Sequence, residues 1–409
     1  MTREHTRETV RLVKRRAAAV LAIVSAGMVL VAAGGTTAAT PTQPGWQRFA
    51  FGYAADSGRF FRPLGFASGR VWYAVQGLND DTIWSARVQG GAVTSFVSNP
   101  SDEEHIGQSS IVGTNLVHCC TRQPGGNFSE AAPLLASGKI GPWAPIPGNP
   151  EQVVQQKIYG ADQGVGSAQA AVTIGGRTVW AVAGAATLGA CCTSAGEATD
   201  LRSVLTKPVQ LDPFNVALGI DAQGRLWLAW SERLREPNVM LHLVRLDPAT
   251  LTPLGAKSYG PAWHGEADGA NGDADFALVC ADSCRLVFGN AAGFFAWDGS
   301  AQPVKLLAGD TPGRPHLLGA GYRAGALTIS YLTGNSDRGW QLTLAEADSQ
   351  GRNLHTVAST EVPLAKPHPN ETWIASDVAS ILTPSGYVAA ATYHMSGLKV
   401  QPVLGAVLR

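Results

Sequence analysis

Four segments that join one β-rich stretch of this chain to the next combine imidazole groups with carboxylate or guanidinium groups. Imidazoles and carboxylates that converge on one point can bind a divalent metal or exchange protons with a ligand. The alternative is that these side chains lie separately in solvated loops. We take the following residues as candidate ligand-binding residues: His105, His264, Glu266, Arg314, His316 and His368.

One of these segments also places oxygen donors close together. Asp268, Asn271, Asp273 and Asp275 offer carboxylate and amide oxygens, which Ca²⁺ prefers. The segment lacks the central glycine and the closing glutamate of an EF-hand loop, so a hydrated turn is the alternative. The cofactor prediction is therefore a divalent metal, either calcium on these oxygens or a transition metal on the histidines.

The six cysteines form three close pairs. Cys280 and Cys284 flank three residues between two apolar stretches, which predicts a hairpin with a disulfide across its neck. The others are two adjacent pairs, Cys119 with Cys120 and Cys191 with Cys192. Each adjacent pair can close on itself or cross-link to the other, and four cysteines allow three connectivities. Zinc bound by these four is an alternative, although zinc ligands are usually spaced more widely.

The elements that must position these residues are short β-runs separated by Gly, Asn, Asp and Pro. A pattern of apolar alternation, a turn and an apolar strand, often rich in aromatic residues, recurs, and its copies begin near residues 64, 108, 171, 217, 277, 318 and 379. A period of about 52 residues with three or four strands per copy predicts an all-β fold, a β-propeller. We predict seven blades, with six or eight as alternatives, and a set of β-sandwich domains as the rival fold.

The ends of the repeat region predict how the ring closes. The last copy has only three strands, and residues 46–54 form a separate strand-like segment before the first copy. The N-terminal segment can supply the missing strand and remove an exposed edge. Tryptophans at equivalent places in second strands, Trp72, Trp180 and Trp227, are expected to pack between blades. The connectors, which carry the candidate residues, are expected to converge on the central channel.

The first 39 residues predict an export signal, which leaves residues 40–409 as one propeller domain. Six basic residues lie among the first 16, an apolar run covers 17–33, and small residues follow. A retained signal-anchor is the alternative; after cleavage no stable membrane span is expected. The chain has 31 basic and 31 acidic residues, and removal of the leader leaves a net charge of about −4. This balance argues against a nucleic-acid partner. The export signal predicts a secreted, extracellular protein, and the Ala- and Arg-rich, Lys-poor composition suits a bacterium.

The segment FFRPLGFASGRVWYAV, which begins at Phe60, resembles the opening of sialidase-type propellers. In that family an arginine of a Phe/Tyr-Arg-Ile-Pro motif binds the substrate carboxylate. The resemblance implies this role for Arg62, although the isoleucine is missing, and a strand-end surface arginine is the alternative. It also implies Asp80 or Asp81 as the acid/base residue.

The family's other motifs have weaker counterparts. The segment GNSDRGWQ resembles its Asp-box turn at Asp337 and Gly339, with departures at the serine and tryptophan positions. Tyr393 and Glu232 are the candidates for the family's tyrosine nucleophile and its glutamate.

These observations predict a secreted, ligand-binding propeller that uses its channel-face loops, and whether it is an enzyme stays open. The expected ligand is a glycan or another small polar extracellular molecule. One alternative is an enzyme, either a sialidase-like glycoside hydrolase or a metal-dependent lyase. The other is a structural module that contacts another protein of the cell envelope. An acidic mature chain favours cationic or neutral ligands over polyanions.

Overall fold

The computed structural model describes residues 45–51, 60–76, 81–100, 110–123, 126–145, 169–182, 187–190, 199–200, 212–233, 239–263, 276–290, 292–309, 315–335, 339–363, 377–384, 386–392 and 401–409. The chain divides into two units, Met1–Pro41 and Thr42–Arg409, and every described strand belongs to the second. The predicted signal segment lies outside the described residues. Within the described ranges, no helix is long and apolar enough to cross a membrane.

The described strands pair into seven four-stranded antiparallel sheets. The first contains β2 (Phe60–Ala67), β3 (Arg70–Gln76), β4 (Asp81–Gln89) and β5 (Ala92–Pro100). The second contains β6 (Ser110–Val112), β7 (Asn115–Gln123), β8 (Gly126–Pro133) and β9 (Ala144–Pro145). The third contains β10 (Gln169–Ile174), β11 (Arg177–Val182), β12 (Thr187–Ala190) and β13 (Thr199–Asp200).

The remaining four sheets follow the same scheme. The fourth contains β14 (Asp212–Ile220), β15 (Leu226–Arg233), β16 (Val239–Leu246) and β17 (Pro253–Trp263). The fifth contains β18 (Phe276–Cys280), β19 (Cys284–Asn290), β20 (Gly293–Trp297) and β21 (Val304–Ala308). The sixth contains β22 (His316–Arg323), β23 (Ala326–Asn335), β24 (Gly339–Ala347) and β25 (His355–Glu361). The last joins β26 (Asp377–Thr383), β27 (Gly386–Thr392) and β28 (Gln401–Leu408) to β1 (Trp46–Phe51).

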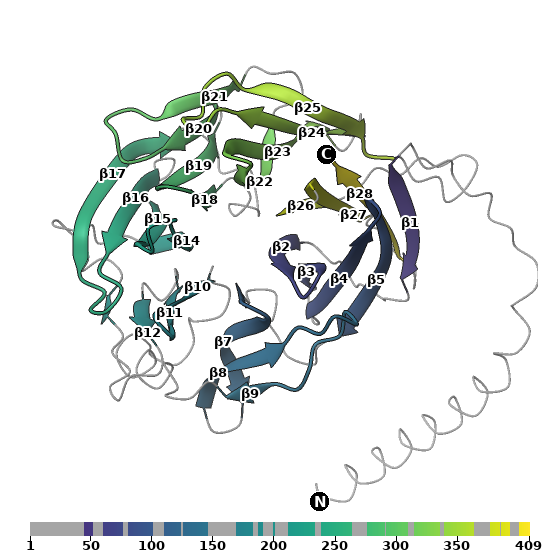
Figure 1. Ribbon diagram of the computed structural model, residues 1–409, viewed down its shortest axis with the longest axis horizontal. Helices are drawn as coiled ribbons and strands as arrows, with labels where there is room; N and C mark the ends of the chain where they lie inside the picture. The colour runs from purple at the N-terminus through teal and green to yellow at the C-terminus, as the bar shows by residue number, and fades with distance from the viewer. Residues whose placement is uncertain are drawn as a thin grey trace, which may run out of the picture. The chain divides into compact units, whose positions relative to one another are not determined.

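The sheets of this second unit follow one another around a central axis (Figure 1). The inner strands β2, β6, β10, β14, β18, β22 and β26 contact one another in that order, and β26 returns to contact β2. Sequential sheets whose inner strands form a closed series define a β-propeller. The prediction of an all-β propeller is therefore confirmed.

The fourth sheet buries both faces because its neighbours cover it. In β15, Leu228 and Trp230 pack toward β11 of the preceding sheet, where they join Val179. The alternate residue Ala229 packs on the other side against Leu286 of the following sheet. This alternation is what a pleated strand with period two requires, and it explains why second strands read as almost continuous apolar runs.

Tryptophans in second strands take part in this packing. Trp72 is completely buried, joins a cluster with Leu116 of the next sheet, and donates a hydrogen bond of 3.0 Å to the Ala67 carbonyl. The predicted packing role is confirmed for Trp72. Trp227 packs against the cluster between the fourth and fifth sheets, whereas the side chain of Trp180 lies outside the described residues.

Strand β1 lies beside the last strand of the chain. Residues Trp46–Phe51 pair antiparallel with β28, from Trp46 opposite Ala406 to Phe51 opposite Gln401. Trp46 is 2% exposed, and its indole nitrogen donates to the Thr360 hydroxyl at 3.3 Å. The beginning and end of the second unit therefore share one sheet.

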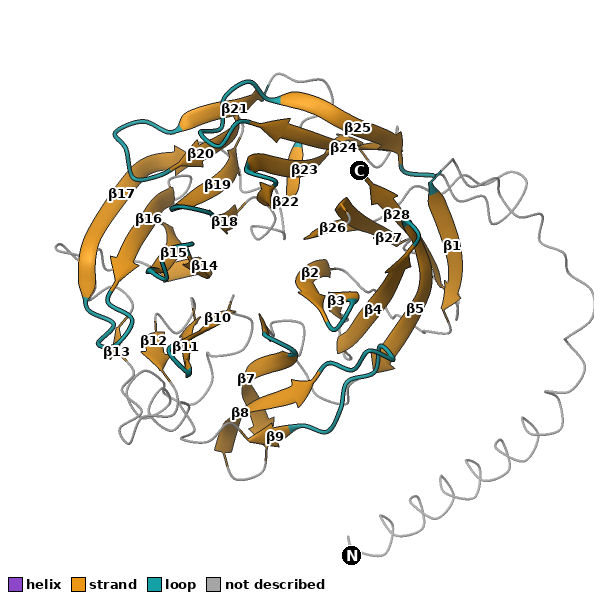
Figure 2. Ribbon diagram, in the orientation of Figure 1, coloured by secondary structure: helices purple, strands orange, loops and turns teal. Residues whose placement is uncertain are grey.

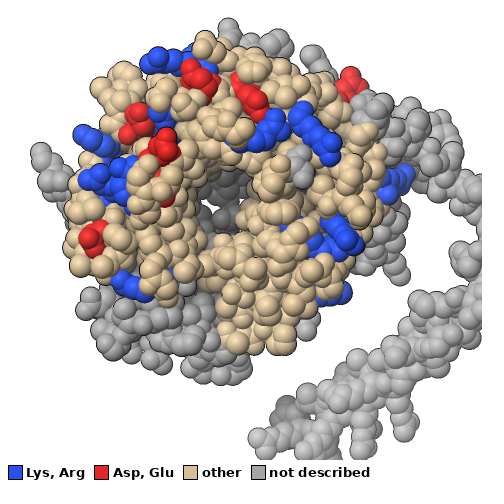
Figure 3. Space-filling view, in the orientation of Figure 1, with Lys and Arg blue, Asp and Glu red and all other residues tan. Residues whose placement is uncertain are grey.

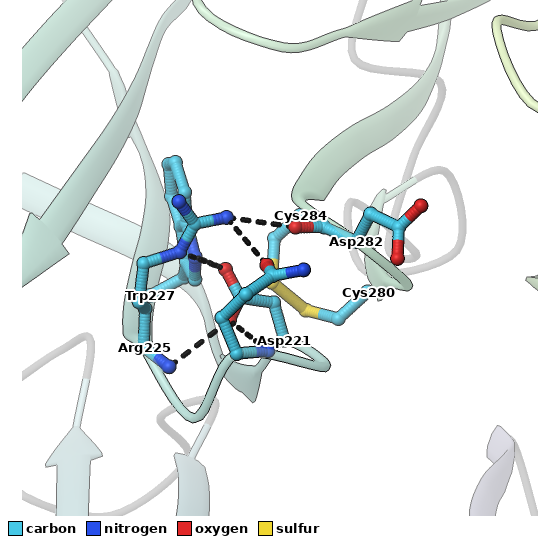
Figure 4. Close-up of a disulfide and its surroundings, with 7 residues drawn as sticks. Asp221, Arg225, Trp227, Cys280, Asp282 and Cys284 are labelled. Carbon is cyan, nitrogen blue, oxygen red and sulfur yellow. Dashed lines mark hydrogen bonds and ion pairs between the residues drawn. A yellow bond between two sulfur atoms is a disulfide. The ribbon is translucent and has the colours of Figure 1, made fainter.

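The predicted hairpin disulfide is present. Cys280 and Cys284 lie directly opposite each other in β18 and β19, with their Cα atoms 4.0 Å apart, and they are bonded (Figure 4). The bond packs on the neighbouring sheet at Gly219, where a Cβ atom would collide with the Cys280 sulfur. Of the other four cysteines, Cys191 and Cys192 lie outside the described residues, and Cys119 and Cys120 are described only as part of strand β7.

A charged turn stands beside this disulfide (Figure 4). The buried Asp221 carboxylate accepts hydrogen bonds from the Trp227 indole at 2.7 Å and from the Arg225 guanidinium at 2.6 Å. The same guanidinium donates to the Asp282 carbonyl of the next sheet at 2.7 Å. Burial alone raises the pKa of Asp221, but these hydrogen bonds and the adjacent positive charge outweigh it and hold the pKa below its usual value.

We expect Asp221→Asn to lower the free energy of unfolding by about 2 kcal/mol at pH 7. Because the folded-state pKa is depressed, the carboxylate stabilises the fold fully above its unfolded pKa, and this contribution is lost as the pH falls through the folded value. Urea unfolding between pH 7 and pH 3 should therefore show the two proteins converging in acid. Asp282→Asn is the control, because it changes an exposed side chain and keeps the backbone carbonyl that accepts from Arg225. A stability difference between wild type and Asp221→Asn that does not change with pH would contradict the role assigned to the Asp221 carboxylate.

Candidate functional site

The predicted channel-face residues belong mostly to the connectors, drawn in grey in Figure 2. Of the candidate ligand-binding set, the structure describes His316. The others lie outside the described residues: His105, His264, Glu266, Arg314 and His368, together with Asp268, Asn271, Asp273 and Asp275 of the calcium prediction and Asp337 and Tyr393 of the sialidase resemblance.

Two of the residues implied by the sialidase resemblance are described only as backbone. Arg62 lies in β2 opposite Ala74, and Asp81 is the first residue of β4, opposite Gln76. Asp80 lies outside the described residues. Glu232 is described fully: it lies in the second strand β15, is fully buried and bonds to His242. The carboxylate is therefore engaged within the sheet.

His316 forms an aromatic pair at one end of the sixth sheet. It is the first residue of the inner strand β22, it is half-buried, and its ring lies edge-on to the Trp340 indole with centroids 5.9 Å apart and planes at 78°. Trp340, the second residue of the third strand β24, is also half-buried. An imidazole and an indole thus stand together where the connector that precedes residue 315 enters the inner strand.

The strand between them explains how these rings meet. His316 is opposite Leu332 in β23, and Gly334, on the same face of that strand, is opposite Trp340. Gly334 has a φ of 115°, and a Cβ there would collide with the carbonyl oxygen of Gly339. A glycine is therefore required at this position, and the register of the three strands places Trp340 on the same face as His316.

A second polar cluster lies inside the fourth sheet. His242 in β16 is fully buried, and its Nδ1 atom lies 2.8 Å from the hydroxyl of Ser258, the residue opposite it in β17. Its Nε2 atom lies 3.2 Å from the buried carboxylate of Glu232. Trp230 stacks on the imidazole with ring centroids 4.6 Å apart. Of its three polar residues, only Glu232 was a candidate from the sequence, because the residues belong to three strands and only the strand register brings them together.

The described side chains contain no group of three or more metal-ligating residues.

On the face seen in Figure 3, Lys and Arg side chains lie among Asp and Glu side chains around the rim, and the centre of the face is hollowed. The described part of this face therefore lacks the uniformly basic surface that a polyanion would require.

No protein-family model and no curated protein matches the chain. Among solved structures, a Trypanosoma rangeli sialidase bound to 2,3-difluoro-KDN is similar at a TM-score of 0.44 and 8% identity, over 89% of this chain and 58% of the sialidase. The chain thus spans less than two thirds of that sialidase's length. AofleA from Arthrobotrys oligospora has a TM-score of 0.44 and 8% identity over 78% of this chain and 92% of its own. A neuraminidase-like protein of A/flat-faced bat/Peru has a TM-score of 0.41 and 11% identity, over 89% and 93% of the two chains.

The fold defines the chain as a β-propeller. Its structural neighbours include sialidases at very low identity, and this similarity concerns the fold alone. No specific family is identified for the chain.

Proposed function

We propose that this chain is an exported propeller that binds a small polar ligand, most simply a glycan, at the connector end of its inner strands. The observation that carries the proposal is the pair formed by His316 and Trp340, both half-buried and both at that end of the sixth sheet. The other predicted ligand-binding histidines precede inner strands in the sequence, as His316 begins one.

The chemistry of the pair suits a sugar. An indole presents an apolar face to the C–H groups of a pyranose, while an imidazole can donate or accept a hydrogen bond with a hydroxyl group. Ligand sites usually combine such an aromatic wall with a few polar groups that determine orientation. The metal-dependent alternative rests on residues outside the described ranges, whereas the glycosidase alternative includes Arg62 and Asp81, of which only the backbone is described, and Glu232, which is buried.

Export and blade number belong to the same proposal. The disulfide between Cys280 and Cys284 supports an oxidising compartment. We also infer seven blades, with β1 as the outer strand of the last one. The seven four-stranded sheets and the pairing of β1 with β28 support that inference. Replacement of Trp46, a buried residue of β1, tests whether this strand belongs to the folded ring.

We expect His316→Ala to weaken glycan binding by about tenfold, since one hydrogen bond in a binding site is worth about 1 kcal/mol or somewhat more. The full chain would be screened on an array of neutral and acidic glycans, and the dissociation constant of a bound glycan would then be measured by calorimetry. His355→Ala is the matched control, because this exposed histidine begins the outer strand β25 and bonds to its own turn at the Asn353 carbonyl. Equal affinities of the two variants would contradict the assigned site, and a wild-type chain that binds no glycan would contradict the ligand class.

A further inference from the structure

We propose that Ser258 is a nucleophile, activated by His242 and Glu232, that attacks ester-type and organophosphorus electrophiles from the outer edge of the fourth sheet. This activity is separate from the ligand site proposed at His316. It rests on a chain of three side chains from three neighbouring strands.

The geometry is that of a nucleophile, a base and an orienting acid. The Ser258 Oγ atom lies 2.8 Å from His242 Nδ1, and His242 Nε2 lies 3.2 Å from a Glu232 carboxylate oxygen. A base within hydrogen-bond reach of a hydroxyl and held by a third group is the signature of an activated nucleophile. Such a site is recognised by the geometry and the roles of its three residues, and it occurs on unrelated folds.

The environment gives each group a different task. Glu232 and His242 are fully buried, whereas Ser258 is exposed. A buried carboxylate beside an imidazole keeps the Nε2 proton between them, which leaves the Nδ1 lone pair facing the serine hydroxyl. Trp230 stacks on the ring and holds its orientation. The second carboxylate oxygen of Glu232 has no hydrogen-bond partner among the described residues, so its charge is available to stabilise a protonated imidazole.

Ser258 is also accessible, and the strand that carries it lies at the edge of its sheet. Strand β17 is the last strand of its sheet and pairs only with β16 in the described part of the chain. In an edge strand, alternate backbone N–H groups point away from the sheet. Such an N–H near Ser258 can donate to the oxygen of a tetrahedral intermediate, which is the role of an oxyanion hole.

The reaction balances with water as the only co-substrate. The serine oxygen bonds to the carbonyl carbon of an ester while its proton moves to His242 Nδ1. The ester C–O bond then breaks, and the alcohol leaves with that proton. Water attacks the acyl-serine and gives its proton to Nδ1; the carboxylic acid is released as the serine oxygen recovers that proton.

A fluorophosphonate probe tests the proposal on the folded full chain, with the adduct located by mass spectrometry of peptides. The adduct is expected on Ser258 and absent in Ser258→Ala. Ser359→Ala is the matched control, because Ser359 is an exposed outer-strand serine whose opposite residue is Thr343, 3.2 Å away, with no imidazole. This variant should react as the wild type does.

The labelling rate separates activation from simple exposure. His242→Gln and Glu232→Gln are each expected to slow labelling of Ser258, His242→Gln by about 100-fold or more. Circular dichroism would establish that each variant is folded, and the Ser258→Ala result stands on its own if either is not. Absence of an adduct on the wild type, an adduct that persists in Ser258→Ala, or equal labelling of Ser258 and Ser359 would overturn the proposal.

Discussion

Replacement of Trp46 by alanine is expected to lower the free energy of unfolding by about 3–5 kcal/mol, the range for a large buried aromatic side chain. The indole is 2% exposed and packs in one cluster with residues such as Leu344 and Leu404, which come from two different sheets. It also donates a hydrogen bond to Thr360. Loss of the side chain leaves a cavity at the place where β1 meets β28, and guanidinium unfolding measures the effect.

Gln47→Ala is the control for this prediction, because Gln47 is the next residue of β1 and is exposed. A surface substitution of this kind changes stability by about 0.5 kcal/mol or less. If both variants unfold at the same denaturant concentration, β1 does not belong to the cooperative fold. The inference that the N-terminal strand completes a seven-bladed ring would then be wrong.

The second large effect is expected at the buried acid–base pair. His242→Leu should cost about 3–5 kcal/mol, because removal of one partner leaves the Glu232 carboxylate buried without compensation. Both side chains are fully buried, so water cannot take the place of the missing partner. The measurement is again denaturant unfolding at neutral pH.

The double variant Glu232→Met with His242→Leu separates charge from packing. Replacement of both partners of a buried hydrogen-bonded pair by apolar residues of similar volume is often neutral or stabilising. We therefore expect the double variant to recover most of the stability lost in His242→Leu. A double variant that is less stable than the single one would show that the cost arises from packing around Trp230 and not from an unpaired charge.

Some of this architecture could be predicted because it is encoded locally. The hairpin at Cys280 and Cys284 needs only two apolar strands and a three-residue turn, and the pairing register then brings the sulfur atoms together. The packing of Trp72 follows from its place in a second strand, which is covered on both faces. The recurrence of such units along the chain predicts blades that must pack on one another.

The candidate site was less predictable because distance along the sequence does not determine distance in space. His316 was predicted from its place before an inner strand, yet its partner Trp340 lies across β23, and only the pairing register of three strands brings the two rings together. The Asp221 turn was also missed, although its aspartate, glycine and tryptophan follow one another within seven residues, because its role depends on hydrogen bonds to Trp227 and Arg225.

The sequence by itself determined the strands, their turns and the class of fold, since alternating burial and turn chemistry act over a few residues. Only the tertiary structure decided which side chains meet across strands. Glu232, His242 and Ser258 lie up to 26 positions apart, and a shift of one residue in the pairing of β16 and β17 would turn Ser258 away from the imidazole. Register is set by the packing of whole sheets, so the chemistry of this cluster emerges only when the sheets are assembled.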